Sequence, residues 1–178
     1  VPHPKYLLDL KGLDPVTAAP YACAGVTTYS ALKKLEKDFN TPIVIFGAGG
    51  LGLMALSLLK ALGGKGAIVV DIDARKREAA EAAGALATVD GKAPDALEQL
   101  AKAFGGGAPW ALPLIPIKAI TIQGSYVGNL RETEELLDLV RNQKIAPIPV
   151  TRMPLAKANE ALTDLQKGKL VGRAVLTP

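Results

Sequence analysis

The sequence predicts an α/β fold: a doubly wound parallel sheet with flanking helices. Buried-strand runs alternate with helix-forming stretches through the middle of the chain, which is typical of a parallel sheet with helical crossovers. The strand run at 43–46 also leads directly into a glycine-rich turn and an apolar helix. With 178 residues and 49% hydrophobic content, the chain can bury one sizeable core.

Three short elements are expected before the glycine turn. A strand is expected at 6–8. Asp14 and Pro15 then start a helix, because an acidic cap and a proline in the first helical position are both favourable there. A second helix is expected at 27–37, where apolar residues recur on one side.

The rest of the chain is expected to alternate strand and helix. Strands are predicted at 43–46, 67–71 and 86–89, and helices at 50–62, 74–83 and 94–103. The tail is predicted to hold a strand at 119–123, a helix at 131–142, a strand near 148–152, a helix opened by Pro154 and running to about Lys167, and a last strand at 172–176.

The glycine-rich turn has the spacing G-x-G-x-x-G at Gly47, Gly49 and Gly52, with Gly50 and Leu51 between them. Between a strand and a helix, this spacing suits a dinucleotide pyrophosphate. The first glycine allows a sharp turn, the second lets phosphate approach the backbone, and the third lets the helix pack closely on the sheet. The helix then points unpaired N–H groups at the anion. Alone, the motif is weak, because glycine turns are often plain loops.

The second strand ends in Asp71, about 20 residues after the turn, where this fold places an acid that binds the adenosine ribose. The alternative is a solvated acid at a strand end. Asp73 is expected to cap the helix that follows it. A carboxylate at Asp71 favours NAD because it repels the 2′-phosphate of NADP, whereas Arg75 and Lys76 leave NADP open.

Composition argues against several function classes. The net charge is +4, and the dense basic run at 75–77 is compensated by neighbouring acids, so no nucleic-acid partner is expected. The single cysteine cannot form an internal disulfide, and prolines interrupt the longest apolar runs. We therefore expect no membrane span and a cytoplasmic location. Because the sequence opens without Met, we expect it to begin inside a longer protein.

Five sequence runs follow one another in an order that is typical of one protein family: AAPYACAGVTTYSAL, IVIFGAGGLG, VVDID, TIQGSYVGN and GKLVGRAVL. Together they resemble the cofactor-binding, Rossmann-type domain of the medium-chain, zinc-dependent alcohol dehydrogenases, over nearly the whole chain. The glycine motif occurs in many families, whereas the first run together with the last two is much more specific for this one. The resemblance implies an enzyme that transfers hydride between an alcohol and NAD, with zinc activating the alcohol.

The resemblance also implies a set of cofactor contacts along the chain. It places Thr27 beside the nicotinamide, Gly47, Gly49, Gly50, Leu51 and Gly52 at the pyrophosphate turn, Asp71 and Lys76 at the adenosine ribose, Ser125 and Val127 near the carboxamide, and Arg173 at the pyrophosphate. Plainer alternatives exist. Thr27 can be a helix-start residue, Ser125 a turn residue and Arg173 a solvated strand end.

Cys23, in the run PYACAG, matches a protein ligand of the family's catalytic zinc, although a lone cysteine is ordinarily a small buried hydrophobe. A thiolate there completes a tetrahedral site that keeps one position open for the alcohol oxygen. The family's other ligands lie in an amino-terminal domain that this sequence lacks. We therefore expect the chain alone to bind dinucleotide without catalysing.

One stretch departs from the family pattern. Between the helix that ends near residue 103 and residue 108, the family has a strand, a helix and another strand, and such a crossover needs roughly 30 residues. We expect the sheet to be incomplete there, with a gap beside the glycine-motif strand in the order 3-2-1-4-5-6. Either residues are missing from the sequence as given, or they were removed deliberately, or a natural deletion is healed by sheet closure or strand exchange.

The expected organisation has three parts. Residues 1–40 join the chain to a catalytic domain, 41–152 form the dinucleotide-binding domain, and 153–178 return to the catalytic side. By the same resemblance, 109–124 form a subunit contact, so a dimeric or tetrameric homo-oligomer is expected. The expected substrate is a small alcohol or carbonyl compound. Two alternatives are a zinc-free quinone or enoyl reductase of the same superfamily and a non-catalytic dinucleotide-binding module.

Overall fold

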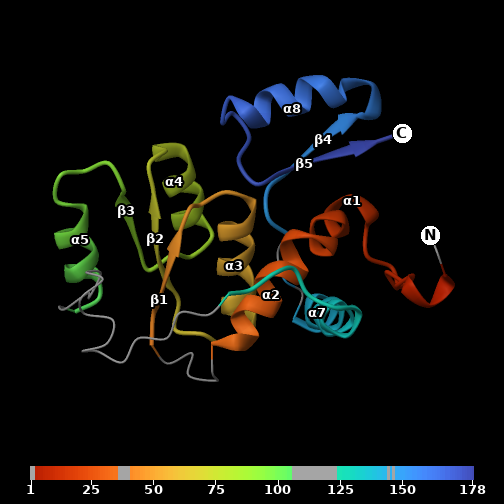
Figure 1. The fold of residues 1–178 in the computed structure, drawn as a ribbon, viewed down its shortest axis with the longest axis horizontal. Helices are drawn as coiled ribbons and strands as arrows, with labels where there is room; N and C mark the ends of the chain where they lie inside the picture. Colours follow the sequence, from red (N-terminus) through yellow and green to blue (C-terminus); the bar gives the residue numbers. More distant parts are fainter. Residues whose placement is uncertain (1–2, 36–40, 106–123, 144, 146) are drawn as a thin grey trace.

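The computed structural model describes residues 3–35, 41–105, 124–143, 145 and 147–178 (Figure 1). Its main sheet consists of β1 (Ile43–Phe46), β2 (Ala67–Asp71) and β3 (Ala87–Asp90). The three strands are parallel and lie in the order β1-β2-β3, with Ile43 opposite Ala67 and Ile68 opposite Ala87. This is the order expected for the first half of a doubly wound sheet.

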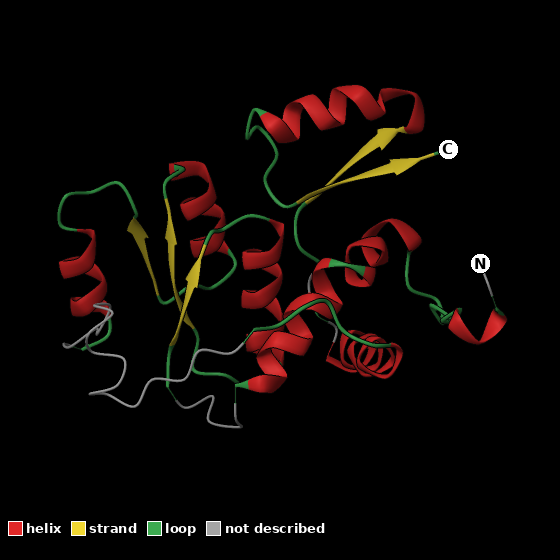
Figure 2. Cartoon of the chain, in the orientation of Figure 1, coloured by secondary structure: helices red, strands yellow, loops and turns green. Residues whose placement is uncertain are grey.

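Helices cover both faces of this sheet (Figure 2). The helices α3 (Gly50–Ala61) and α4 (Ala74–Ala82) pack in one core cluster with Ile43, Ile45 and Val69. The helix α5 (Ala96–Ala103) packs in a second cluster, through Leu100, with Ile68 and Val89. Alternate strand residues therefore face different layers, and the predicted doubly wound α/β fold is confirmed. The predicted bounds of these six elements hold to within two residues.

The carboxy-terminal strands form a second, smaller sheet. In it, β4 (Val150–Pro154) and β5 (Arg173–Thr177) pair in parallel, and α8 (Ala158–Gln166) lies between them in the chain. Pro154 was expected to open the helix, but it ends the strand opposite Thr177, and a 3₁₀ turn (Leu155–Lys157) precedes α8. A proline fits this last strand position because it has no N–H to leave unpaired.

The amino-terminal part is helical, and the predicted strand at 6–8 is wrong. Residues Pro4–Tyr6 form a 3₁₀ turn, because the ring of His3 accepts the N–H of Lys5 (3.1 Å) and proline suits the first helical position. Next come α1 (Pro15–Ala18), capped by Asp14 as expected, a 3₁₀ turn (Ala19–Ala22) and α2 (Ala24–Lys34). The helix α2 begins three residues earlier than predicted.

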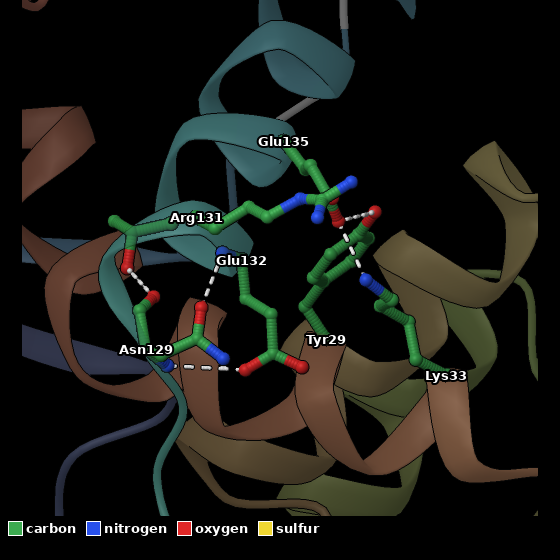
Figure 3. A network of polar contacts seen from close by, with 7 residues as sticks. Tyr29, Lys33, Asn129, Arg131, Glu132 and Glu135 are labelled. Atoms are coloured by element: carbon green, nitrogen blue, oxygen red, sulfur yellow. Dashed lines mark hydrogen bonds and ion pairs between the residues drawn. The ribbon is translucent and has the colours of Figure 1, made fainter.

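A long helix, α7 (Leu130–Gln143), packs beside α2. A polar network joins the two (Figure 3): Glu135 accepts hydrogen bonds from Lys33 (2.6 Å) and Tyr29 (3.3 Å), and Arg131 pairs with its other oxygen (3.2 Å). The Lys33 hydrogen bond lowers the pKa of Glu135, whereas burial raises the pKa of Tyr29. The network fixes the start of α7 against the helix that follows Cys23.

One edge of the main sheet is formed by β1, which has β2 as its only strand neighbour among the residues described. Phe46, at the end of β1, is 65% exposed. The expected gap beside the glycine-motif strand stays a prediction, because residues 106–123 lie outside the described part of the chain. The predicted strand at 119–123 and nearly all of the predicted subunit contact at 109–124 fall outside the described residues. Within the described part of the chain, no helix is long and apolar enough to span a bilayer.

Candidate functional site

The turn between β1 and α3 has backbone geometry that only glycine accommodates at two positions. Gly47 has a φ of +94°, in the left-handed region that side chains disfavour. A Cβ on Gly52 would collide with the carbonyl group of Gly47, so α3 lies directly against the turn. The first and third glycines of the motif therefore have the structural roles that its spacing predicts.

The middle of the turn faces open space. A Cβ built on Gly49 would meet no atom within 4 Å. One built on Gly50 would strike Nε of Arg173 and the carbonyl oxygen of Gly172 (2.8 Å). The arginine stem from β5 therefore lies against the first residue of α3. Here the N–H groups of a helix terminus meet a cation, an arrangement that suits a phosphate.

Arg173 has one polar atom without a partner among the residues that the structure describes. Its Nε is buried and makes no hydrogen bond within the part of the chain that the structure describes. Leaving a buried donor unpaired costs roughly 1–3 kcal/mol, and such groups usually mark a ligand position or an ordered water. An anion placed between the glycine turn and Arg173 would satisfy this donor.

A pocket of about 680 Å³ joins these features. One wall is the glycine turn with Ile45 and Phe46, and the other is formed by α8 and the start of β5, including Arg173 and Leu162. Of the residues predicted to bind cofactor, the pocket brings together Gly47, Gly49, Gly50, Leu51, Gly52 and Arg173. Its size falls within the range of small-molecule and cofactor sites.

Asp71 lies at the end of β2 and is bonded to the turn itself. Its Oδ2 accepts the N–H of Ala48 (2.7 Å), and its Oδ1 accepts the N–H of Asp73 (2.8 Å). Arg77 donates to the backbone carbonyl of Asp71 (2.9 Å) and pairs with Asp90 on β3 (3.1 Å). The carboxylate is therefore held in one orientation beside the glycine turn, with lone pairs left over for ribose hydroxyls.

The other predicted contacts are more dispersed. Thr27 is half-buried, and its neighbour Thr28 lines the pocket instead. Ser125 accepts a hydrogen bond from Lys34 (3.0 Å) and lines an adjoining groove of about 300 Å³ that Thr28 also borders. Asp71, Lys76 and Val127 are not among the residues that line the 680 Å³ pocket. Val127 has a φ of +48°, unusual for a β-branched residue.

The sequence interpretation did not include Thr28 or α8 among the pocket residues. Thr28 was detectable only through the fold, because a helical pattern does not tell which of two adjacent threonines faces β1. For α8 a signal was present, since Ala158, Ala161, Leu162 and Leu165 recur at helical spacing. That apolar stripe lines the pocket.

Cys23 is the N-cap residue of α2, and its side chain is exposed. It borders a small pocket of about 270 Å³ that also contains Arg173. Among the described residues, no group of three or more His, Cys, Asp or Glu side chains could hold a metal ion. One thiolate does not make a tetrahedral zinc site, so the described residues do not form a zinc centre by themselves.

Comparison with known proteins identifies one stretch of the chain and the kind of protein that the whole chain is similar to. Residues 50–112 match the model of the zinc-binding dehydrogenase family, and this stretch corresponds to the family's cofactor-binding domain. The whole chain is similar to an NAD-dependent alcohol dehydrogenase of Sulfurisphaera tokodaii at 34% identity, covering 62% of that protein. The chain therefore spans about 62% of the length of the first curated relatives that it matches.

Solved dehydrogenase structures support the same assignment. The alcohol dehydrogenase of the archaeon Aeropyrum pernix superposes with a TM-score of 0.79 at 29% identity, over 92% of this chain and 58% of that one. An acetophenone reductase from Geotrichum candidum, solved in complex with NAD, superposes with a TM-score of 0.77 at 25% identity, over 94% of this chain and 57% of that one.

The alignment with the Sulfurisphaera tokodaii protein is longer than this chain. The match to the Sulfurisphaera tokodaii protein runs over 216 positions, whereas this chain has 178 residues, a difference of at least 38 positions. A strand–helix–strand unit needs roughly 30 residues. The difference is therefore large enough to hold the elements that the sequence pattern lacks between residues 103 and 108.

Proposed function

We propose that this chain is the dinucleotide-binding part of an NAD-dependent, zinc-type alcohol dehydrogenase. The observation that carries the proposal is the pocket between the glycine turn and Arg173, whose buried Nε has no partner among the described residues. A dinucleotide pyrophosphate supplies the anion that this donor and the N-terminus of α3 would bind. The named relatives act as NAD-dependent alcohol dehydrogenases.

Under this proposal, NAD lies with its pyrophosphate at the glycine turn, its adenosine toward Asp71 and its nicotinamide toward α2. The turn at Gly47–Gly52 and Arg173 would hold the pyrophosphate, and Asp71 would accept hydrogen bonds from the adenosine ribose. Thr27, Ser125 and Val127 would lie toward the nicotinamide, and Lys76 toward the ribose. When bound, the nicotinamide supplies the hydride acceptor. The chain's own part is to bind and orient it.

We propose that the whole protein oxidises a small alcohol, or reduces the matching carbonyl compound, with zinc held partly by Cys23. The exposed position of Cys23 near Arg173 supports a role as ligand. The remaining ligands must come from outside the described residues. Zinc analysis of the full-length protein separates this proposal from a zinc-free quinone or enoyl reductase: no bound zinc, or no change in activity on Cys23→Ser, contradicts it.

The assembly and location are also proposals. We propose a homo-oligomer, a dimer or a tetramer, on the basis of the family resemblance of 109–124, and sedimentation as a monomer at high concentration contradicts it. The single cysteine supports a reducing, cytoplasmic compartment.

Calorimetric titration of the chain with NADH tests the central proposal. We expect binding, and we expect Arg173→Met to weaken it about tenfold or more, because hydrogen bonds to charged groups contribute about 1.5–3 kcal/mol. Arg152→Met is the matched control, since Arg152 lies on the neighbouring strand, is exposed and does not line the pocket. No binding of NADH, or equal effects of the two substitutions, overturns the proposal.

A further inference from the structure

A chain of charged contacts begins at Asp71, whose carboxylate is bonded to the glycine turn through the N–H of Ala48. The carboxylate of Asp71 accepts the N–H of Asp73 (2.8 Å). The carboxylate of Asp73 in turn caps α4 by accepting the N–H of Arg75 (3.0 Å). Sequence reasoning predicted this cap and nothing more for Asp73. The structure shows that the same carboxylate has a second partner.

That second partner is the guanidinium group of Arg75. Its Nη2 lies 3.0 Å from Oδ2 of Asp73 and its Nε 3.4 Å from Oδ1, so the two groups form a two-pronged pair. This pairing lowers the pKa of Asp73 and raises that of Arg75. The two opposite charges thus lie against each other one hydrogen bond away from Asp71, the residue proposed to bind the ribose.

Arg75 also contacts the loop after α8. Its Nη2 donates to the backbone carbonyl of Gly168 (3.1 Å). Gly168 lies just before Leu170, Gly172 and Arg173, which line the wall of the pocket opposite the glycine turn. The guanidinium thus bridges the start of α4 and the loop after α8, and its N–H groups are engaged by three acceptor atoms.

An arginine near the adenosine ribose can also bind a phosphate group. A guanidinium presents a planar fork that suits phosphate oxygens, and an arginine near the ribose accommodates the 2′-phosphate of NADP. Arg75 stands two residues past Asp73, on the helix that follows Asp71. What separates it from that use in this structure is its pairing with Asp73 and the Gly168 carbonyl.

We infer that Asp73 is a second determinant of coenzyme choice, acting by holding Arg75 in the pair that bridges α4 and the loop after α8. In this arrangement Asp71 repels a 2′-phosphate directly, and Asp73 removes the cation that would attract it. Asp73 is thus a positioning residue that acts through Arg75. The inference rests on the proposed binding of a nicotinamide dinucleotide in this pocket.

The test measures dissociation constants for NADH and NADPH by calorimetry at one fixed ionic strength. Asn caps helices about as well as Asp, so Asp73→Asn removes the charge and keeps the cap. We expect this variant to shift the affinity ratio about tenfold toward NADPH, the size of one charge-assisted hydrogen bond. Arg75→Gln alone should leave the ratio near that of the unsubstituted chain.

The double variant Asp73→Asn with Arg75→Gln separates the mechanism from a simple charge effect. We expect its ratio to return to that of Arg75→Gln. Asp95→Asn is the matched control, because Asp95 is likewise an acid at the N-cap of a helix, α5, and its carboxylate bonds to Gln99 of that helix and to no arginine among the described residues. It should leave the ratio unchanged.

Several outcomes overturn the inference. An unchanged ratio in Asp73→Asn does so, and so does an equal shift in the single and double variants, because the charge of Asp73 would then act without Arg75. In both cases NADH binding by the unsubstituted chain would leave the proposed function standing. Failure of that chain to bind either coenzyme removes the proposed function and this inference together.

Discussion

The two walls of the proposed cofactor pocket are built differently. The wall at the glycine turn rests on α3, where Leu53, Leu58 and Leu59 are at most 1% exposed. The opposite wall rests on α8, where Leu162 and Leu165 are more than 60% exposed and Ala161 alone is buried.

The two walls would contact a ligand in different ways. The glycine turn offers backbone atoms, whereas α8 offers apolar side chains. At the glycine turn, backbone atoms approach each other so closely that a single Cβ on Gly52 has no space. On α8, apolar side chains border the pocket without filling it. The first wall should therefore be intolerant of substitution and the second tolerant, since close-packed regions respond to the loss or gain of one methylene.

Truncating one leucine in each wall should produce the largest difference. Leu58→Ala is expected to lower the free energy of unfolding by about 3 kcal/mol, because it leaves a cavity in a fully buried site. Leu162→Ala should change it by less than about 0.5 kcal/mol, because its side chain is already mostly in solvent. Urea unfolding followed by circular dichroism measures both, and similar losses would refute the contrast.

Adding one methyl group within the turn gives the next largest effect. Gly52→Ala should lower the free energy of unfolding by about 2 kcal/mol, because the new Cβ meets the Gly47 carbonyl and α3 must move. Gly49→Ala should leave stability nearly unchanged, because its φ of −76° is allowed and its Cβ would face open space. If phosphate occupies that space, Gly49→Ala still weakens NADH binding. A stable Gly52→Ala variant with normal affinity would contradict this account of the turn.

A smaller, pH-dependent effect is expected where α2 meets α7 (Figure 3). The pKa of Glu135 is lowered in the folded state, chiefly by the Lys33 hydrogen bond. A lowered folded pKa means that its contribution to stability is present above the unfolded value of about 4.5 and is lost as pH falls through the folded pKa. Glu135→Gln should therefore flatten the acid limb of the stability profile below pH 4.5 and leave the limb above it parallel to that of the original chain. If Glu135→Gln left the acid limb unchanged, Glu135 would not be a source of the acid sensitivity.

The sequence was sufficient for the elements whose signals are local. The strand at 43–46, the glycine turn and the helix after it each carry a pattern of their own, and their bounds are confirmed. The strand predicted at 6–8 failed because a histidine cap and Pro4 favour a 3₁₀ turn there. The end of β4 at Pro154 depended on pairing with Thr177, a partner distant in the chain that no local pattern reveals.

The candidate site was predictable in its residue types and less so in its contacts. The motif and its spacing indicated Gly47, Gly49 and Asp71, because each has a fixed place relative to the first strand. They could not indicate that Thr28 would line the pocket, or that Arg75 would reach Gly168. Those contacts depend on how elements distant in the sequence pack against one another. That packing is set by the core as a whole and not by any local sequence pattern.

The hydrogen bond from Ala48 to Asp71 has a consequence for engineering. Ala48 is fully buried, so replacing Asp71 by Gly or Ala to admit a phosphorylated coenzyme would also deprive a buried backbone N–H of its acceptor. That loss costs roughly 1–3 kcal/mol. A redesign of this domain should start from Asp71→Asn, which removes the charge and keeps an oxygen for Ala48. Under the proposed function, the side chain that sets coenzyme preference is therefore also one that the fold needs.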